Sequence, residues 1–347
     1  LLAREGTPVE VFDRRSGGGG RFHGGWQVLE NSASELDALA ELGALGLAAG
    51  CEAIPARRAS FFGSRPGERF EVVSREPYAY FIRRGSGAGS LDAVLRAEAH
   101  SAGVRLRDGE AAPAGAEIIA TGPRQADGVA RETTFSADLP DTVAVLFDPE
   151  VTPTGYAYLF CLGGRGTFGV AQVRGVKHIR KSRERAWERF RRELGSFPLR
   201  SEHESGQYMG FAIPRHLRSP DGRWHVGEAA GVQDFLYGLG NRLALRSAAL
   251  AAAGVAGRWD ERGFIEQVVR PMRTSVALRF LYERAGARAS ASFCRRAAGA
   301  DFRSFLRRLQ QPVWAKDLLA MAVMARWRAR GGCRHGELCS WCRARER

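Results

Sequence analysis

The stretch that most constrains the fold is residues 224–253, where two glycine-rich turns follow a short apolar run. The run leads into Gly-Glu-Ala-Ala-Gly at 227–231, and Gly-Leu-Gly-Asn at 238–241 precedes an Ala-rich helix that continues to Ala253. A carboxylate in the first turn can bond polyol hydroxyls, and the free amides at a helix start can bind a carbonyl or a phosphate. The pattern predicts a ligand-binding turn; the alternative is a glycine-rich loop before a core helix.

The first residues of the chain resemble the second half of a dinucleotide-binding βαβ unit. Residues 1–5 predict the last turn of a helix capped by Gly6, and residues 9–12 predict a strand that ends at Asp13. An acid at such a strand tip accepts hydrogen bonds from a ribose diol. We expect the preceding strand and GxGxxG turn to lie upstream of Leu1, which implies an N-terminal truncation. The alternative is that Asp13 merely ends a strand.

Helices and strands alternate through the first 122 residues, which indicates an α/β domain. A glycine-rich loop at 17–25 carries Arg21 and His23. The expected elements are a helix at 33–46, short strands within 61–82, an amphipathic helix at 91–102, a strand at 103–106 and a buried strand at 117–122.

Residues 134–217 have a different pattern, typical of an antiparallel sheet. Apolar runs at 143–147, 156–160 and 167–171 are separated by Pro and Gly, and a charged helix is predicted at 182–194. We interpret this part as a second layer inserted into the first domain. Tyr156, Tyr158 and Phe160 alternate and would share one strand face, which suits an apolar cavity and equally suits core packing. His23 and Tyr156 are candidate proton donors, with a structural role as the alternative.

The charge of the chain is concentrated near its end. Lys and Arg number 52 against 38 Asp and Glu, for a net charge of +14. Residues 258–347 carry 20 basic and 8 acidic side chains, so the remainder is nearly neutral. Because only 3 of the basic residues are Lys, we attribute the excess to a general preference for Arg and expect no nucleic-acid partner. Residues 258–330 predict helices, which could dock on the body or contact an anionic membrane surface.

Cysteine usage indicates a reducing, cytoplasmic compartment, because Cys51, Cys161 and Cys294 are scattered along the chain. The last part is different, since four soft ligands fall within ten residues. They could hold zinc or an iron–sulfur cluster, or they could be free side chains in a frayed tail: Cys333, His335, Cys339 and Cys342. The longest apolar runs are shorter than the ~18 residues that a membrane helix needs.

The order of these pieces resembles the FAD-dependent oxidoreductases of the hydroxylase-like fold, and most closely the geranylgeranyl reductase group. The strand ending at Asp13 and Arg14, Arg83 before the 91–102 helix, and Ala120-Thr121-Gly122 are similar to motifs of that group. Three later segments are also similar to motifs of that group: Gly155–Phe160, Ile213-Pro214 and 227–241. The 227–241 segment is the most specific of them. The resemblance covers residues 1 to about 257.

The resemblance implies an α/β fold: a Rossmann-like FAD-binding domain (1–60, 84–133 and 218–257), an inserted antiparallel-sheet substrate domain (61–83 and 134–217), and a helical Arg-rich region (258–347). It implies that FAD is held by Asp13, Arg14, Arg83, Gly122, Gly227, Glu228, Gly231, Gly238, Leu239, Gly240 and Asn241. Substrate would lie against Tyr156, Tyr158 and Phe160.

The implied activity is reduction of a carbon–carbon double bond in a hydrophobic, isoprenoid or lipid-like molecule, with NAD(P)H as a possible electron donor. Three residues depart from the pattern of that group and limit what the resemblance implies about the activity. Glu228 replaces the usual Asp but keeps a carboxylate, whereas Tyr158 and Cys161 replace a Trp and a Pro, so prenyl specificity does not carry over. One alternative is a flavin-dependent monooxygenase. Another is a basic binding or scaffold protein that keeps a degenerate flavin fold.

Overall fold

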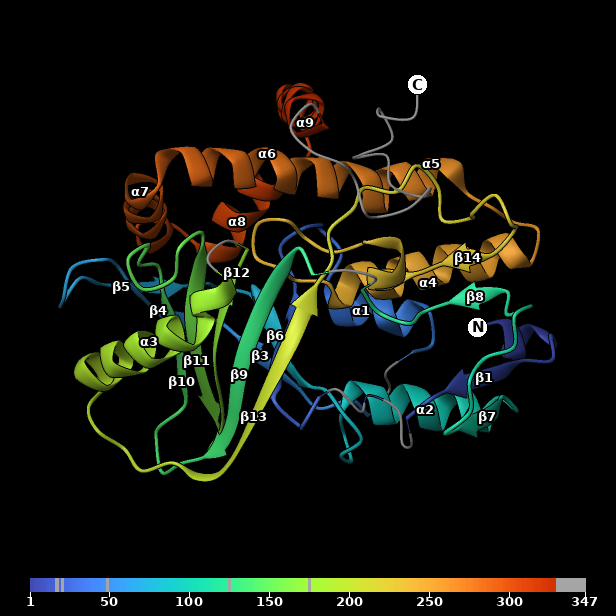
Figure 1. Cartoon of the computed structure of the whole chain (residues 1–347), viewed down its shortest axis with the longest axis horizontal. Helices are drawn as coiled ribbons and strands as arrows, with labels where there is room; N and C mark the ends of the chain where they lie inside the picture. Colours follow the sequence, from blue (N-terminus) through green and yellow to red (C-terminus); the bar gives the residue numbers. More distant parts are fainter. Residues whose placement is uncertain (16–18, 20–21, 48–49, 124–125, 174–175, 329–347) are drawn as a thin grey trace.

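The computed structural model describes residues 1–15, 19, 22–47, 50–123, 126–173 and 176–328. It has a large mixed sheet, smaller sheets with flanking helices, and a helical C-terminal region (Figure 1). This confirms the predicted α/β class.

The largest sheet has seven strands in the order β13-β9-β12-β11-β10-β4-β5. Neighbouring strands are antiparallel except β10 and β4, which pair in parallel. Their bounds are β4 Arg58–Phe62, β5 Arg69–Val73, β9 Gly128–Ser136, β10 Thr142–Leu146, β11 Gly155–Leu162, β12 Arg165–Gln172 and β13 Arg200–Met209. The strands expected within 143–171 therefore exist, and the sheet also takes in residues 128–133.

The two faces of this sheet are covered differently. The charged helix α3 (Ile179–Leu194) packs on one face, where Phe190 lies 6.1 Å from the ring of Phe62. The other face, which carries Tyr158 and Phe160, joins a larger core that includes the C-terminal helices. This second face is the one that approaches the glycine-rich segment.

The remaining strands form three small sheets. β1 (Glu10–Asp13) pairs in parallel with β7 (Arg105–Asp108), and β8 (Ile118–Ile119) pairs in parallel with β14 (Trp224–His225). A three-stranded antiparallel sheet contains β2 (Trp26–Glu30), β6 (Ala79–Arg83) and β3 (Ala53–Ala56). The helices beside them are α1 Ala38–Ala44, α2 Leu91–Ser101 and α4 Asn241–Val255.

Two of the elements predicted in this part of the chain are shorter than expected. The helix predicted at 33–46 covers only α1, because the side chain of Asp37 caps the amides of Leu39 and Ala40 and so fixes a later start. The buried strand predicted at 117–122 is only the two residues of β8. Ile118 is 36% exposed, since β8 pairs with just the two residues of β14 among the described strands.

The predicted C-terminal helices are present. They are α5 Glu261–Phe264, a π-helical segment Ile265–Val269, α6 Arg270–Ala285, α7 Ala287–Ala298, α8 Phe302–Gln310 and α9 Trp314–Arg328. They form a layer above α4 and the large sheet (Figure 1). Helix α9 docks through Ala320, Val323 and Met324, while Trp314 stays 74% exposed.

Two expectations concern properties beyond the fold. Of the helices in the described residues, none has the length and apolar character needed to cross a membrane. The described part of the chain also holds no group of His, Cys, Asp and Glu placed to bind a metal ion. The Cys333, His335, Cys339 and Cys342 cluster lies outside the described residues.

Candidate functional site

The Gly-Glu-Ala-Ala-Gly segment forms a tight turn directly after β14. Residues Gly227–Ala230 make a 3-10 turn, and Gly231 caps it with φ 71°. A Cβ on Gly231 would lie 2.3 Å from the Cβ of Ala212, so only glycine fits there. The amide of Gly227 donates a 2.9 Å hydrogen bond to the hydroxyl of Ser247 in α4, which ties the turn to that helix.

The second glycine turn leads into α4. Gly238 adopts φ 72°, and the amide of Asp234 bonds the carbonyl of Leu239 at 3.0 Å. Helix α4 begins at Asn241, and Gly240 gives it no side-chain cap. The first amides of a helix have no acceptor within the helix, so they remain available to a ligand.

The side chain of Gln233 adds a second feature to this turn. Its Nε2 donates to the carbonyl of Gly238 at 2.6 Å, whereas its buried Oε1 has no hydrogen-bond partner in the described structure. A buried acceptor without a partner is costly, and a ligand with an N–H group would satisfy it. Together with the helix amides, this arrangement fits the carbonyl and N–H edge of a flavin ring.

Arg84, which sequence reasoning missed, contacts the motif, and its neighbour Arg83 does not. Arg84 forms a two-pronged ion pair with Asp92 of α2, with both distances 2.8 Å, and donates a 2.5 Å bond to Oδ1 of Asn241. Arg83 instead bonds Glu52 at 2.7 Å and the carbonyl of Ala88. The two arginines are adjacent in sequence, so one residue of offset decides which of them supports the motif.

Asn241 also donates a 3.0 Å bond to the carbonyl of Val28 in β2. Burial alone would raise the pKa of Asp92, but the hydrogen bonds and charge of Arg84 outweigh it and lower that pKa. The hydrogen bonds that join Asp92, Arg84 and Asn241 therefore fix the start of α4 against α2, and the bond from Asn241 to β2 fixes it against that strand.

The other predicted cofactor residues lie on two separate small sheets. Asp13 ends β1 and accepts a 2.9 Å bond from the amide of Arg15, while Arg14 is exposed. Gly122 follows β8 with φ 79°, and Glu228 lies in the turn after β14, partly buried. Figure 1 places the β8–β14 pair and the β1–β7 pair on the same side of the molecule.

The three predicted substrate residues lie side by side on β11. The rings of Tyr156 and Tyr158 are 5.8 Å apart, and those of Tyr158 and Phe160 are stacked at 5.1 Å. Tyr158 and Phe160 are 6% and 7% exposed, so they pack as core residues in this structure. The hydroxyl of Tyr156 donates a 2.5 Å bond to the carbonyl of Tyr237, which joins this aromatic face to the loop between the two glycine turns.

A buried carboxylate that sequence reasoning also missed lies on the same face. Glu132 of β9 is 4% exposed and accepts hydrogen bonds from three side chains. We call Glu132 and these three donors the Glu132 cluster. Gln27 of β2 donates at 2.9 Å and Gln207 of β13 at 2.8 Å, and the hydroxyl of Tyr158 donates to the same carboxylate. Burial and the nearby Glu132 charge raise the pKa of Tyr158 well above its ordinary range.

His23, the other candidate proton donor, lies outside this cluster. Its ring is 3.8 Å from that of His203. Burial, the His203 charge and the Arg15 charge lower the pKa of His23. The ring of His23 therefore lies against His203 of β13.

No family model and no curated protein matches the chain. Solved structures do match it. A geranylgeranyl bacteriochlorophyll reductase-like protein from Thermoplasma acidophilum is 15% identical, with 94% of each chain covered and a TM-score of 0.56. A flavoprotein/dehydrogenase from Cytophaga hutchinsonii is 15% identical over 94% of this chain and 96% of that chain, also with TM-score 0.56. A p-nitrophenol 4-monooxygenase from Pseudomonas putida is 16% identical over 92% and 93%, with the same score. The chain thus shares the FAD-dependent oxidoreductase fold.

Proposed function

We propose that the chain binds FAD at the 227–241 segment and acts as a flavin-dependent oxidoreductase on a hydrophobic molecule. The observation that carries the proposal is the joint presence of this fold and an uncapped α4 start next to the unpartnered Gln233 Oε1. Gly238, Gly240 and Asn241 would hold the flavin ring, and Glu228 and Asp13 the polyol groups of the cofactor. Bound FAD would supply the hydride chemistry.

The residues of the aromatic face have two roles in this proposal. Tyr156 is held by Tyr237, so the face keeps its position against the motif loop. Tyr158 keeps its proton at Oη because burial and Glu132 raise its pKa, and Glu132 orients the hydroxyl. Saturation of a carbon–carbon double bond needs a proton in addition to a hydride, and Tyr158 is our candidate for its donor. Its raised pKa makes it a weak acid, so it would protonate only the strongly basic carbon that hydride addition leaves.

An aromatic, mostly apolar wall selects shape more than charge. We therefore favour reduction, or the reverse oxidation, of a carbon–carbon bond in an isoprenoid or lipid-like substrate, with NAD(P)H as the candidate donor of electrons. Oxygen insertion is the second candidate, favoured by the equal likeness to the p-nitrophenol 4-monooxygenase.

The test is to reduce the FAD-loaded chain without air and add prenyl, carotenoid and quinone-type compounds. Flavin reoxidation matched by a reduced product supports the reductase. Turnover that requires oxygen and yields a hydroxylated product assigns the chain to the monooxygenases instead. Tyr158→Phe should slow turnover at least tenfold with unchanged FAD affinity, whereas the 62% exposed Tyr208→Phe should match the wild type.

A further inference from the structure

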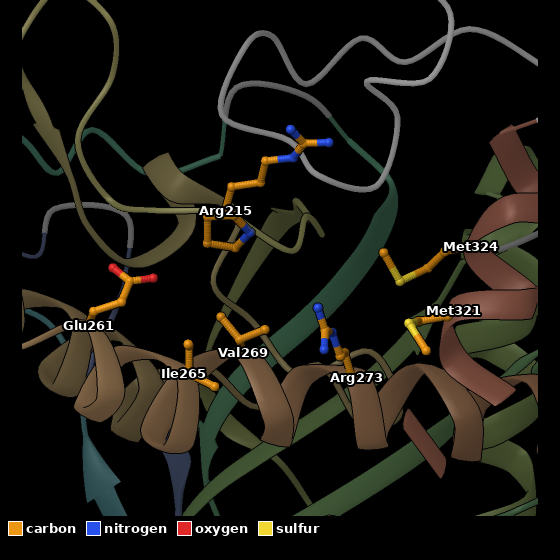
Figure 2. A pocket seen from close by; sticks show the side chains of 8 residues that line it. Arg215, Glu261, Ile265, Val269, Arg273, Met321 and Met324 are labelled. Carbon is orange, nitrogen blue, oxygen red and sulfur yellow. The ribbon is translucent and has the colours of Figure 1, made fainter. Parts of the chain in front are cut away.

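A cavity lies between the C-terminal helices and the segment that follows β13, apart from the glycine turns. Its volume is about 390 Å³, within the range of small-molecule sites. Pro214 and Arg215 line one side, the π-helical segment and α6 form the floor, and Met321 and Met324 of α9 close the end (Figure 2).

The cavity is lined by a cation, Arg273, that forms no ion pair with the described residues. On the same helical run, Arg270 pairs with Glu266 and Arg279 with Glu283, in each case four residues away. Arg273 has Val269 and Ala277 at those positions, so the helix offers it no carboxylate. Its Nε is buried without a hydrogen-bond partner among the described residues. A buried N–H group without an acceptor is costly, and an anionic ligand in the cavity would supply one.

The charges around Arg273 limit the ligand to a single negative charge. Arg215 lines the wall opposite Arg273 with its side chain directed away from that helix, and no ion pair within the described chain engages it (Figure 2). Glu261 lines the cavity as well, and its carboxylate accepts a 2.8 Å bond from the indole of Trp259 rather than pairing with either arginine. Two cations and one anion favour a carboxylate over a doubly charged phosphate.

The rest of the lining is apolar and adaptable. Ile265 and Met321 are 38% and 46% exposed, although large apolar side chains usually pack inside. Methionine side chains adjust to irregular ligands, and π-helical turns such as Ile265–Val269 occur frequently at functional sites. An apolar wall next to an unpaired guanidinium suits a molecule with one acidic end and a hydrocarbon body.

We propose that this cavity binds an aliphatic monocarboxylate of fatty-acid type, with its carboxylate on Arg273 and its chain against Val269, Met321 and Met324. The site does not depend on FAD. The segment that carries Arg215 also contacts the first glycine turn, since Ala212, three residues before Arg215, packs against Gly231.

The test is calorimetric titration of the chain with decanoate below its aggregation limit, beside 1-decanol, which has no charge, and acetate, which has no chain. Decanoate should bind one per chain and at least tenfold more tightly than either. Arg273→Gln should weaken decanoate at least tenfold, whereas Arg284→Gln, which changes an exposed arginine of α6 outside the cavity, should stay within twofold.

A second variant tests the apolar wall without touching a buried group. Met321→Gln should weaken decanoate at least fivefold, and Leu281→Gln, at a 50% exposed position of α6 outside the lining, should not. The proposal is overturned if decanoate shows no saturable binding, if Arg273→Gln binds it as the wild type does, or if decanol or acetate binds equally well.

Discussion

The hydroxyl of Tyr158 reaches the carboxylate of Glu132 across an intervening strand, because Gly169 of β12 stands between them without a side chain. Gly169 pairs in register with both Tyr158 and Glu132. A Cβ on Gly169 would lie 2.5 Å from the Tyr158 hydroxyl oxygen, so the tyrosine ring occupies the space of the missing side chain. The glycine therefore permits the Glu132 cluster to form.

Gly169→Ala should displace Tyr158 from Glu132 and lower the free energy of unfolding by about 1–3 kcal/mol, because the added methyl overpacks a buried face. Gly206→Ala is the matched control. It lies in β13 with open space at its Cβ position, and it should change stability by no more than about 0.5 kcal/mol. Urea unfolding of both variants measures the difference. Equal stability of the two would contradict the role of Gly169.

Arg84→Ala should destabilise the chain more than Arg83→Ala. The side chains of Arg84 and Asp92 are only 21% and 16% exposed, so removing Arg84 leaves a shielded carboxylate unpaired and costs about 2–3 kcal/mol. Glu52, the partner of Arg83, is 42% exposed, and loss of that pair should cost about 1 kcal/mol or less. Thermal unfolding compares the variants. The reverse order would mean that Arg83 supports the motif.

The pH dependence of stability should report on Asp234 in the motif loop. Burial raises its pKa from 3.8 to about 6, against the opposing hydrogen bond from the Tyr237 amide. The folded state therefore holds this proton more tightly than the unfolded state. Its stabilising effect is full below pH 4 and is lost as the pH rises to about 6.

Asp234→Asn keeps an acceptor for the Tyr237 amide but cannot ionise. Relative to this variant, the wild type should lose up to about 3 kcal/mol between pH 4 and pH 7. Urea unfolding at several pH values gives the difference. Parallel profiles for the two proteins would show that Asp234 titrates normally.

The glycine turns could be predicted from sequence because their geometry is local. A turn at 227–231 and a helix that starts after Gly240 follow from residue type and spacing alone. The Glu132 cluster could not be predicted in this way, since it joins side chains from β2, β9, β11 and β13. Gly169 indicates that another group approaches the strand closely at that position. It does not indicate which side chain occupies the space.

Adjacent arginines illustrate a second limit of sequence reasoning. Arg83 and Arg84 differ by one position, and the loop before α2 decides which of them faces Asn241. The extent of short elements such as β8 likewise depends on which strands lie beside them.

The central claim is that FAD binds at the 227–241 segment, and fluorescence titration of the chain with FAD tests it most directly. Saturable one-to-one binding is predicted, weakened at least tenfold in Glu228→Ala, which loses a carboxylate for the cofactor polyol. Glu266→Ala, which changes an exposed glutamate outside the segment, should bind as the wild type does. Absence of saturable binding, or unchanged affinity in Glu228→Ala, would contradict the claim.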